Sequence, residues 1–158
     1  MNIGASREGA YGNYYKYGLG AEQYDINQVN YTGTEDPLAT SADTAVQVWG
    51  GQWRMPTKAQ FQELFANTNY TWAKVNYTYG GKFTSKTDNT KYVFFPAAGF
   101  WDDNTRQSAG GGGFYWSSSP ENSNFSYYIN FNSINKIVDI RLRKNGCTIR
   151  PVCTIEMS

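Results

Sequence analysis

Two segments in the first half of the chain have the apolar spacing of short amphipathic helices. Over residues 42–49, apolar side chains recur at positions i, i+3, i+4 and i+7, and Ser41 precedes them at the N-cap position. Over residues 58–66, the apolar side chains form one stripe, and Thr57 with Gln60 three residues later is the sequence of a capping box. We therefore predict two helices, over 42–49 and 58–66.

The pattern after the helices changes to period two and to short apolar runs, which are typical of strands. The predicted strands span Tyr92–Phe95, Phe114–Ser117, Tyr127–Phe131, Ile137–Leu142 and Thr148–Val152. The first 40 residues have little period and predict irregular structure with short strands. Four consecutive glycines at 110–113 predict either a flexible connection or a close backbone approach. Helices followed by mostly antiparallel strands with long loops indicate an α+β fold.

Two of these strands predict one buried and one displayed face. The predicted buried side chains are Tyr127, Ile129, Phe131, Val138, Ile140 and Leu142. The side chains that alternate with them are Tyr128, Asn130, Asn132, Asp139, Arg141 and Arg143. We predict that the alternating set forms one continuous surface, and a scatter over opposite faces would contradict a binding site there.

The segment around these strands is rich in asparagine, with six Asn in the 25 residues from Glu121 to Asn145. Asparagine is a poor core and strand residue, but its amide both donates and accepts hydrogen bonds. We interpret the segment as a ligand surface held between scaffold residues. The candidate ligand-binding residues are Asn122, Asn124, Phe125, Tyr128, Asn130, Asn132, Asn135, Lys136, Asp139, Arg141 and Arg143.

Composition and charge narrow the class of protein. The 158 residues fit one domain, 1–158, and the 17% aromatic and 17% charged residues favour a loop-rich, surface-displayed domain. The net charge of +1 predicts no nucleic-acid partner, and no apolar run is long enough for membrane insertion. The N-terminus lacks the pattern of a signal peptide. Either the protein is intracellular at some stage or, as we expect, it is the C-terminal domain of a longer chain at a cell or virion surface.

Enzymatic chemistry finds little support in the sequence. The chain has no histidine, its two cysteines (Cys147 and Cys153) are not a CxxC pair, and the glycine run lacks the residues of a phosphate loop. Whether the cysteines pair stays open. The WDDN string, with Asp102 and Asp103, fits a turn better than a calcium site. We expect no enzyme, no cofactor and no metal site.

The tryptophans divide into two groups by their positions. Trp49, Trp53 and Trp116 lie in regular elements or tight motifs, and core packing is the favoured interpretation. Trp72 and Trp101 stand near loop residues, so stacking on a ligand stays open for these two.

Several strings together resemble the Fibrobacter succinogenes major paralogous domain, a family of gut Bacteroidetes and their phages. The strings are WGGQWRMPTKAQFQEL (49–64), FFPAAGF (94–100), YWSSSP (115–120) and NGCTIRPV (145–152), with NIGA and YGNYY near the start. The resemblance covers nearly the whole chain. It implies a C-type lectin-like fold with two helices and a twisted antiparallel sheet, whose surface loops carry ligands.

Some members of that fold group are targets of diversity-generating retroelements, which randomise adenines in a C-terminal template. The resemblance places such a region at Glu121 to Cys147. Residues that a mutated AAC codon yields are Asn122, Asn124, Phe125, Asn130, Asn132, Asn135, Asp139, Arg141 and Cys147. The scaffold would then be Trp116, Ile129, Phe131, Ile149, Arg150 and Val152. An ordinary Asn-rich adhesin surface is an equal alternative.

These observations predict a non-enzymatic adhesin or receptor-binding domain that recognises a cell-surface protein or glycan. The alternatives are a structural subunit of a surface or phage assembly, a carbohydrate-binding module and, less favoured, an enzyme related to the formylglycine-generating fold. The Glu-Pro-Asn and Trp-Asn-Asp strings of calcium-dependent lectins have no match here, which disfavours calcium-dependent sugar binding. Oligomerisation stays open.

Overall fold

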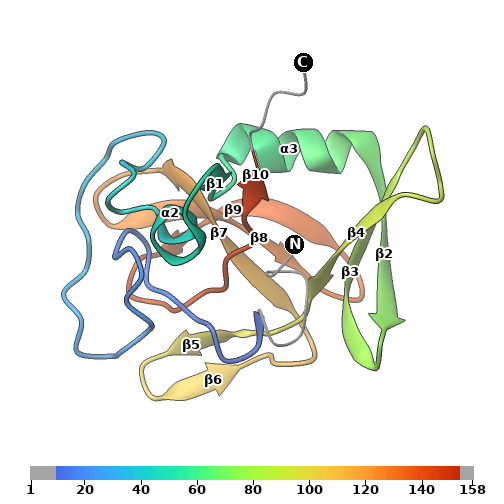
Figure 1. The fold of residues 1–158 in the computed structure, drawn as a ribbon. Coiled ribbons are helices and arrows are strands. Elements are labelled where there is room, and N and C mark those ends of the chain that lie inside the picture. Colours follow the sequence, from blue (N-terminus) through green and yellow to red (C-terminus); the bar gives the residue numbers. More distant parts are fainter. Residues whose placement is uncertain (1–9, 154–158) are drawn as a thin grey trace.

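A three-stranded antiparallel sheet forms the centre of the computed structural model, which describes residues 10–153. Its strands are β7 (Gly113–Pro120), β8 (Phe125–Phe131) and β9 (Lys136–Leu142), in the order β7-β8-β9 (Figure 1). All three were predicted, with slightly different ends. The NIGA string at the start of the chain lies outside the described residues.

Both faces of this sheet are covered, which explains the sequence of β7. Tyr115 and Trp116 are consecutive, so they point to opposite faces, yet each is 0% exposed. We call one side of the sheet the α3 face. There Tyr115, Ile129 and Phe131 pack in one apolar cluster with Phe61. We call the other side the Trp116 face, where Trp116 joins a second apolar cluster that includes Tyr17, Phe100 and Ile149.

The two predicted helices are present. Helix α3 (Lys58–Asn67) begins at the predicted capping box, in which the Gln60 N–H donates to Thr57 Oγ1 (3.1 Å) and the Thr57 N–H to Gln60 Oε1 (2.9 Å). Helix α2 (Thr44–Trp49) begins two residues later than predicted, so Ser41 as its N-cap was wrong. Asp43 is the cap because its carboxylate accepts from the N–H groups of Val46 and Met55.

A second antiparallel sheet lies beside α3 and has the order β2-β3-β4. Its strands are β2 (Thr68–Val75), β3 (Thr78–Ser85) and β4 (Tyr92–Pro96), of which only β4 was predicted. Strand β2 follows α3 with no breaker between them, which hid it from the sequence pattern. Strand β3 contains Gly81, and the rings of Tyr70 and Phe131 occupy the space that a Cβ there would need.

The remaining elements are short. Strands β5 (Phe100–Asp102) and β6 (Thr105–Gln107) form a hairpin, and β1 (Trp53–Arg54) pairs with β10 (Val152–Cys153). The predicted strand over 148–152 is therefore mostly wrong. The segment before β10 instead makes single bridges with three different partners: Cys147 with Tyr15, Gly146 with Trp101, and Thr148 with Tyr115.

The loops follow from local sequence in two places. Residues 10–40 are mostly irregular, as predicted, but the short strands that were also predicted do not form in this described part, which has one bridge, at Tyr15. The glycine run at 110–113 is a close approach, because the ring of Phe131 packs where a Cβ of Gly113 would lie.

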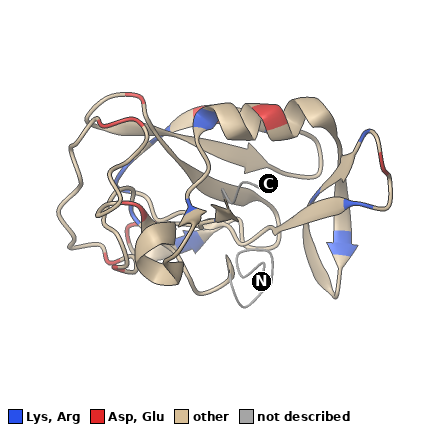
Figure 2. Cartoon of the chain, turned by 45° about the horizontal axis from the view of Figure 1, so that its top comes forward, with Lys and Arg blue, Asp and Glu red and all other residues tan. Residues whose placement is uncertain are grey.

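The architecture is mostly sheet, with few helices and several antiparallel sheets, and it is compatible with an α+β class. Between residues 10 and 153, no helix has the length and apolarity to cross a membrane. Charged side chains of both signs are interspersed over the ribbon (Figure 2).

Candidate functional site

Two of the candidate asparagines are turn residues. Asn122 Oδ1 accepts from the N–H groups of Asn124 (2.9 Å) and Phe125 (3.0 Å). Asn132 Oδ1 accepts in the same way from Ile134 (2.8 Å) and Asn135 (2.9 Å). The first turn joins β7 to β8 and the second joins β8 to β9, so they lie at opposite ends of the central sheet. Part of the asparagine signal thus marks hairpin turns.

Two predicted display residues are buried, which corrects the sequence prediction. Tyr128 is 6% exposed and packs beside Phe114 and Trp116, because the Trp116 face of the sheet is covered. Arg143 is 1% exposed. Its guanidinium donates to the carbonyl oxygens of Tyr31 (2.8 Å), Gly33 (2.8 Å) and Asn122.

The other candidates do not form one continuous surface. Asn130, Asp139 and Arg141 share the Trp116 face, as the pairing of Asp139 with Tyr128 shows. Lys136 belongs to the opposite face, where its ammonium lies 5.2 Å from the centre of the Phe65 ring.

The alternating set itself does share a face, because Tyr128, Asn130, Asp139 and Arg141 all lie on the Trp116 side. The prediction that this whole face is displayed was wrong, since Tyr128 and Arg143 are buried. Ile140 and Leu142, which were predicted to be buried, are 38% and 41% exposed because β9 is an edge strand. The exposed members that remain, such as Asn124 and Asp139, stay a prediction as ligand contacts.

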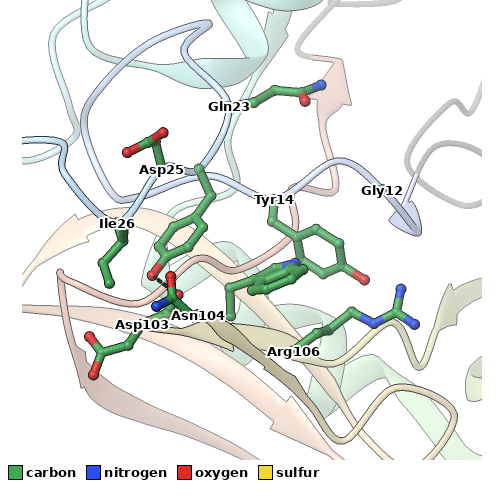
Figure 3. A pocket seen from close by; sticks show the side chains of 10 residues that line it. Gly12, Tyr14, Gln23, Asp25, Ile26, Asp103, Asn104 and Arg106 are labelled. Atoms are coloured by element: carbon green, nitrogen blue, oxygen red, sulfur yellow. Dashed lines mark hydrogen bonds between the residues drawn. The ribbon is translucent and has the colours of Figure 1, made fainter.

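A hollow of about 380 Å³ lies elsewhere, between the N-terminal segment and the β5–β6 hairpin. Ten residues line it: Gly12, Tyr14, Gln23, Tyr24, Asp25, Ile26, Trp101, Asp103, Asn104 and Arg106. We call it the Trp101 pocket. In Figure 3, Asp103 and Arg106 lie at its two ends on the hairpin, and Gln23 and Asp25 face them from the N-terminal segment.

The floor of the Trp101 pocket is aromatic. The Tyr24 ring stacks on Trp101, with centroids 6.1 Å apart and planes 23° apart, and both residues are half-buried. Tyr14 meets Trp101 edge-on at 6.4 Å. The Tyr24 hydroxyl donates to the Asp103 carbonyl oxygen (2.9 Å), and the Tyr14 hydroxyl donates to Ala98 O (2.7 Å). These bonds fix the rings and leave an apolar surface that a flat ligand can cover.

The rim of the pocket is polar and exposed. Gln23, Asp25, Asp103, Asn104 and Arg106 offer amide, carboxylate and guanidinium groups from two separate segments. Burial raises the pKa of the Tyr14 phenol, and the Arg106 guanidinium beside it opposes that rise.

The WDDN string forms the turn that we predicted. Asp103 and Asn104 are the two residues between β5 and β6, and Asp103 has the positive φ of 51° that such turns require. Asp102 is held by the amide of Asn145 (3.0 Å) and the ammonium of Lys144 (3.4 Å). Among residues 10–153, no three Cys, Asp or Glu side chains gather as metal ligands.

Lys16 positions one wall of the pocket. It is 3% exposed, and its ammonium donates to the carbonyl oxygens of Gln28 (2.7 Å) and Ile26 (3.3 Å). Burial lowers the pKa of Lys16, while the carboxylates of Asp25 and Asp103 oppose that change. The buried ammonium thus ties down the loop that carries Tyr24 and its neighbours.

The Asn-rich C-terminal segment positions the other wall. Gly146 and Trp101 exchange two backbone hydrogen bonds, of 2.8 and 2.9 Å. Asn145 bonds Asp102, and its Oδ1 accepts from Arg141 Nε (2.9 Å). Gly146 also leaves room for the Tyr24 ring, whose nearest atom would lie 2.6 Å from a Cβ. The segment that the sequence suggested as a display surface therefore serves, in this part, as scaffold for the pocket.

The tryptophans and cysteines complete the comparison with the sequence. Trp116 is core, as predicted, and Trp101 lines the pocket, where ligand stacking stays open. Trp72 stacks on Tyr79 at 6.0 Å. Cys147 is buried and Cys153 exposed, and both are free thiols.

Sequence reasoning missed most of the pocket. Tyr24 and Asp25 belong to an aperiodic segment in which no pattern marked them, and Tyr14 was noted only as part of the YGNYY string of the resemblance. The one usable signal was Trp101, a tryptophan next to a predicted turn.

Comparison with known proteins gives one partial match. A family described as a domain of unknown function (DUF8237) matches residues 81–152, from within β3 to the start of β10. The matched span is similar to that family and includes the β5–β6 hairpin, but not the N-terminal wall of the pocket. No curated protein and no solved structure matches the chain.

Proposed function

We propose that the chain is a non-enzymatic, glycan-binding domain of C-type lectin-like fold that acts at a cell or virion surface as part of a longer protein. The observation that carries the proposal is the Trp101 pocket, which combines an aromatic floor with a polar rim. Its volume of about 380 Å³ is within the range of small-ligand sites, roughly 300–1,000 Å³.

The chemistry of a sugar ring matches the two parts of the pocket. A pyranose has an apolar face of C–H groups, which packs on aromatic rings, and a periphery of hydroxyl groups that both donate and accept. The Tyr24–Trp101 pair supplies the ring surface. Carboxylates at Asp25 and Asp103 accept from hydroxyls, and the Arg106 guanidinium donates to them. Because the rim carries both charge signs, it favours a polar ligand over a strongly acidic or basic one.

The pre-formed walls support binding more than catalysis. Lys16, Asn145 and Gly146 hold the two walls through hydrogen bonds that do not need the ligand. A site that is already ordered loses little conformational entropy when it binds. The Asp25 and Asp103 carboxylates lie on exposed loops, where neither is placed in a dry environment that would favour proton transfer.

A glycan array followed by titration calorimetry tests the proposal. We expect at least one array hit, and we expect Asp103→Asn and Arg106→Ala each to weaken its binding by about tenfold, the effect of losing roughly 1.4 kcal/mol. Both residues are exposed, and asparagine tolerates the positive φ at position 103, so both variants should fold as the wild type does.

Asp139→Ala is the matched control, because Asp139 is an exposed carboxylate on β9, outside the pocket and in the region that the sequence first suggested. It should leave the affinity unchanged. An array without hits, or a loss of binding in Asp139→Ala and not in Asp103→Asn, would refute the assignment to the Trp101 pocket.

A further inference from the structure

A second hollow, of about 300 Å³, lies between α3 and the strands β4 and β10. Figure 1 shows α3 passing over β10. Most of its walls are apolar, formed by Pro56, Phe61, Leu64, Val93, Phe95 and Val152. Gln60, Glu63, Asn67 and Thr68 contribute polar groups, and Arg150 contributes a cation. We call this hollow the Arg150 groove, and it shares no lining residue with the Trp101 pocket.

Arg150 is the unusual member of this lining. It is 4% exposed, yet its guanidinium pairs with no carboxylate in the part of the chain that the structure describes. Within residues 10–153 its one hydrogen bond runs from Nη1 to the Phe94 carbonyl oxygen, at a long 3.3 Å. The guanidinium also lies 5.0 Å from the centre of the Phe95 ring. Burial lowers the pKa of Arg150 to about 10.

A buried cation without a counter-ion is costly, because desolvation removes its hydration and nothing of opposite charge replaces it. A carboxylate supplies both the charge and two acceptors that suit the planar fork of a guanidinium. Arg143, the other deeply buried arginine, likewise has no carboxylate partner within residues 10–153, but it donates to three carbonyl oxygens and lines neither of the two hollows described here. Arg150 is the one of the two that combines few hydrogen bonds with a hollow that an anion can enter.

We propose that the Arg150 groove binds a small aliphatic carboxylic acid, with the carboxylate at Arg150 and the chain against Phe61, Leu64 and Val93. Charge complementarity with the unpaired guanidinium selects the acid, and the apolar walls select the aliphatic chain. The volume, at the lower end of the range for ligand sites, suits a small molecule rather than a segment of a protein. Glu63 is the one acidic residue among those that line the groove, and its charge opposes the binding of an anion.

Titration calorimetry with octanoate, and with 1-octanol as the uncharged analogue of the same chain, tests this proposal. We expect octanoate to bind the wild type at least tenfold more tightly than octanol, and to raise its melting temperature. Arg150→Lys keeps the charge but loses the bidentate geometry, so it should weaken octanoate binding by about tenfold. Glu63→Gln should strengthen it.

Leu64→Asp tests the same proposal without changing Arg150. This variant places a carboxylate on the wall of the groove and should abolish octanoate binding. Gln62→Asp, at an exposed position of the same helix, is the control and should weaken octanoate binding little. If Arg150→Lys does not fold, this pair still decides the question. Equal affinity for octanoate and octanol, unchanged binding in Leu64→Asp, or no binding at all would overturn the proposal. None of these outcomes depends on the Trp101 pocket.

Discussion

Arg143 is the residue for which the sequence and the structure lead to the most different expectations. The sequence suggested that it is displayed to solvent, whereas the structure buries it. Had Arg143 been a solvent-facing ligand contact, its replacement by alanine would change the free energy of unfolding by no more than about 0.5 kcal/mol. The structure instead buries it to 1% exposure, with hydrogen bonds from its guanidinium to three carbonyl oxygens. We therefore expect Arg143→Ala to be strongly destabilising.

The magnitude follows from those bonds. Hydrogen bonds to a charged group contribute about 1.5–3 kcal/mol each, so three of them give an upper limit of roughly 4.5–9 kcal/mol. The variant also avoids burying the guanidinium, and water can reach some of the carbonyls, which brings the net loss to about 3–5 kcal/mol. For a urea dependence of about 2 kcal/mol per molar, the unfolding midpoint should fall by roughly 2 M.

Urea unfolding followed by tryptophan fluorescence measures this change. Arg143→Lys should recover only part of the loss, because an ammonium cannot reach acceptors in three directions with a fixed fork. Lys144→Ala is the neighbouring control; it removes only a surface ion pair with Asp102 and should cost at most about 1 kcal/mol. A midpoint for Arg143→Ala within about 0.3 M of the wild type, far below the shift expected from the urea dependence, would refute the reasoning.

Three further predictions concern the core and the ionisable groups. Phe131→Ala should cost about 3–5 kcal/mol in the same unfolding assay because Phe131 is 0% exposed, whereas Ile134→Ala, at 90% exposure, should stay within about 0.5 kcal/mol; similar costs for the two would contradict the described packing. Burial raises the pKa of the Cys147 thiol to about 12, whereas Cys153 is exposed. Iodoacetamide at pH 8 should therefore label Cys153 alone in the folded protein and both thiols in urea. Labelling of both thiols without urea would contradict this prediction. Burial also raises the pKa of Asp43. The contribution of this shift to the free energy of unfolding is therefore fully present below the unfolded pKa of about 3.9 and is lost as the pH rises through the folded pKa. The stability of the wild type relative to Asp43→Asn should fall as the pH rises above about 4, and a difference that stays constant with pH would contradict this prediction.

The elements with local signals were predictable from the sequence. The capping box of Thr57 and Gln60 fixed the start of α3, and alternation found β8 and β9. Alternation could not tell which side of a strand is buried, because both sides of β8 are covered: Tyr128 and Ile129 are consecutive, and both are buried. The segments that cover each face of the sheet lie far away in the sequence, so the sequence of one strand does not indicate which of its sides they cover.

The candidate site was harder to predict for the same reason. Asn122 and Asn132 suggested ligand contacts, but their side chains close the two hairpins of the central sheet. The Trp101 pocket brings together residues about 80 positions apart, such as Tyr24 and Asp103, and no local pattern links them. The WDDN string correctly predicted the turn between β5 and β6, but it did not indicate that an N-terminal loop packs against this turn.

The central claim is that ligand binds at the Trp101 pocket and not on the strands β8 and β9. Two-dimensional ¹H–¹⁵N NMR tests it most directly, by titrating a glycan from the array into the labelled protein and following the Trp101 indole N–H and the backbone amides. We expect saturable shifts at Trp101, Tyr24 and the Asp103–Asn104 turn, with the amide of Asp139 unmoved. Shifts confined to β8 and β9, with the Trp101 indole signal unchanged at saturation, would contradict the account.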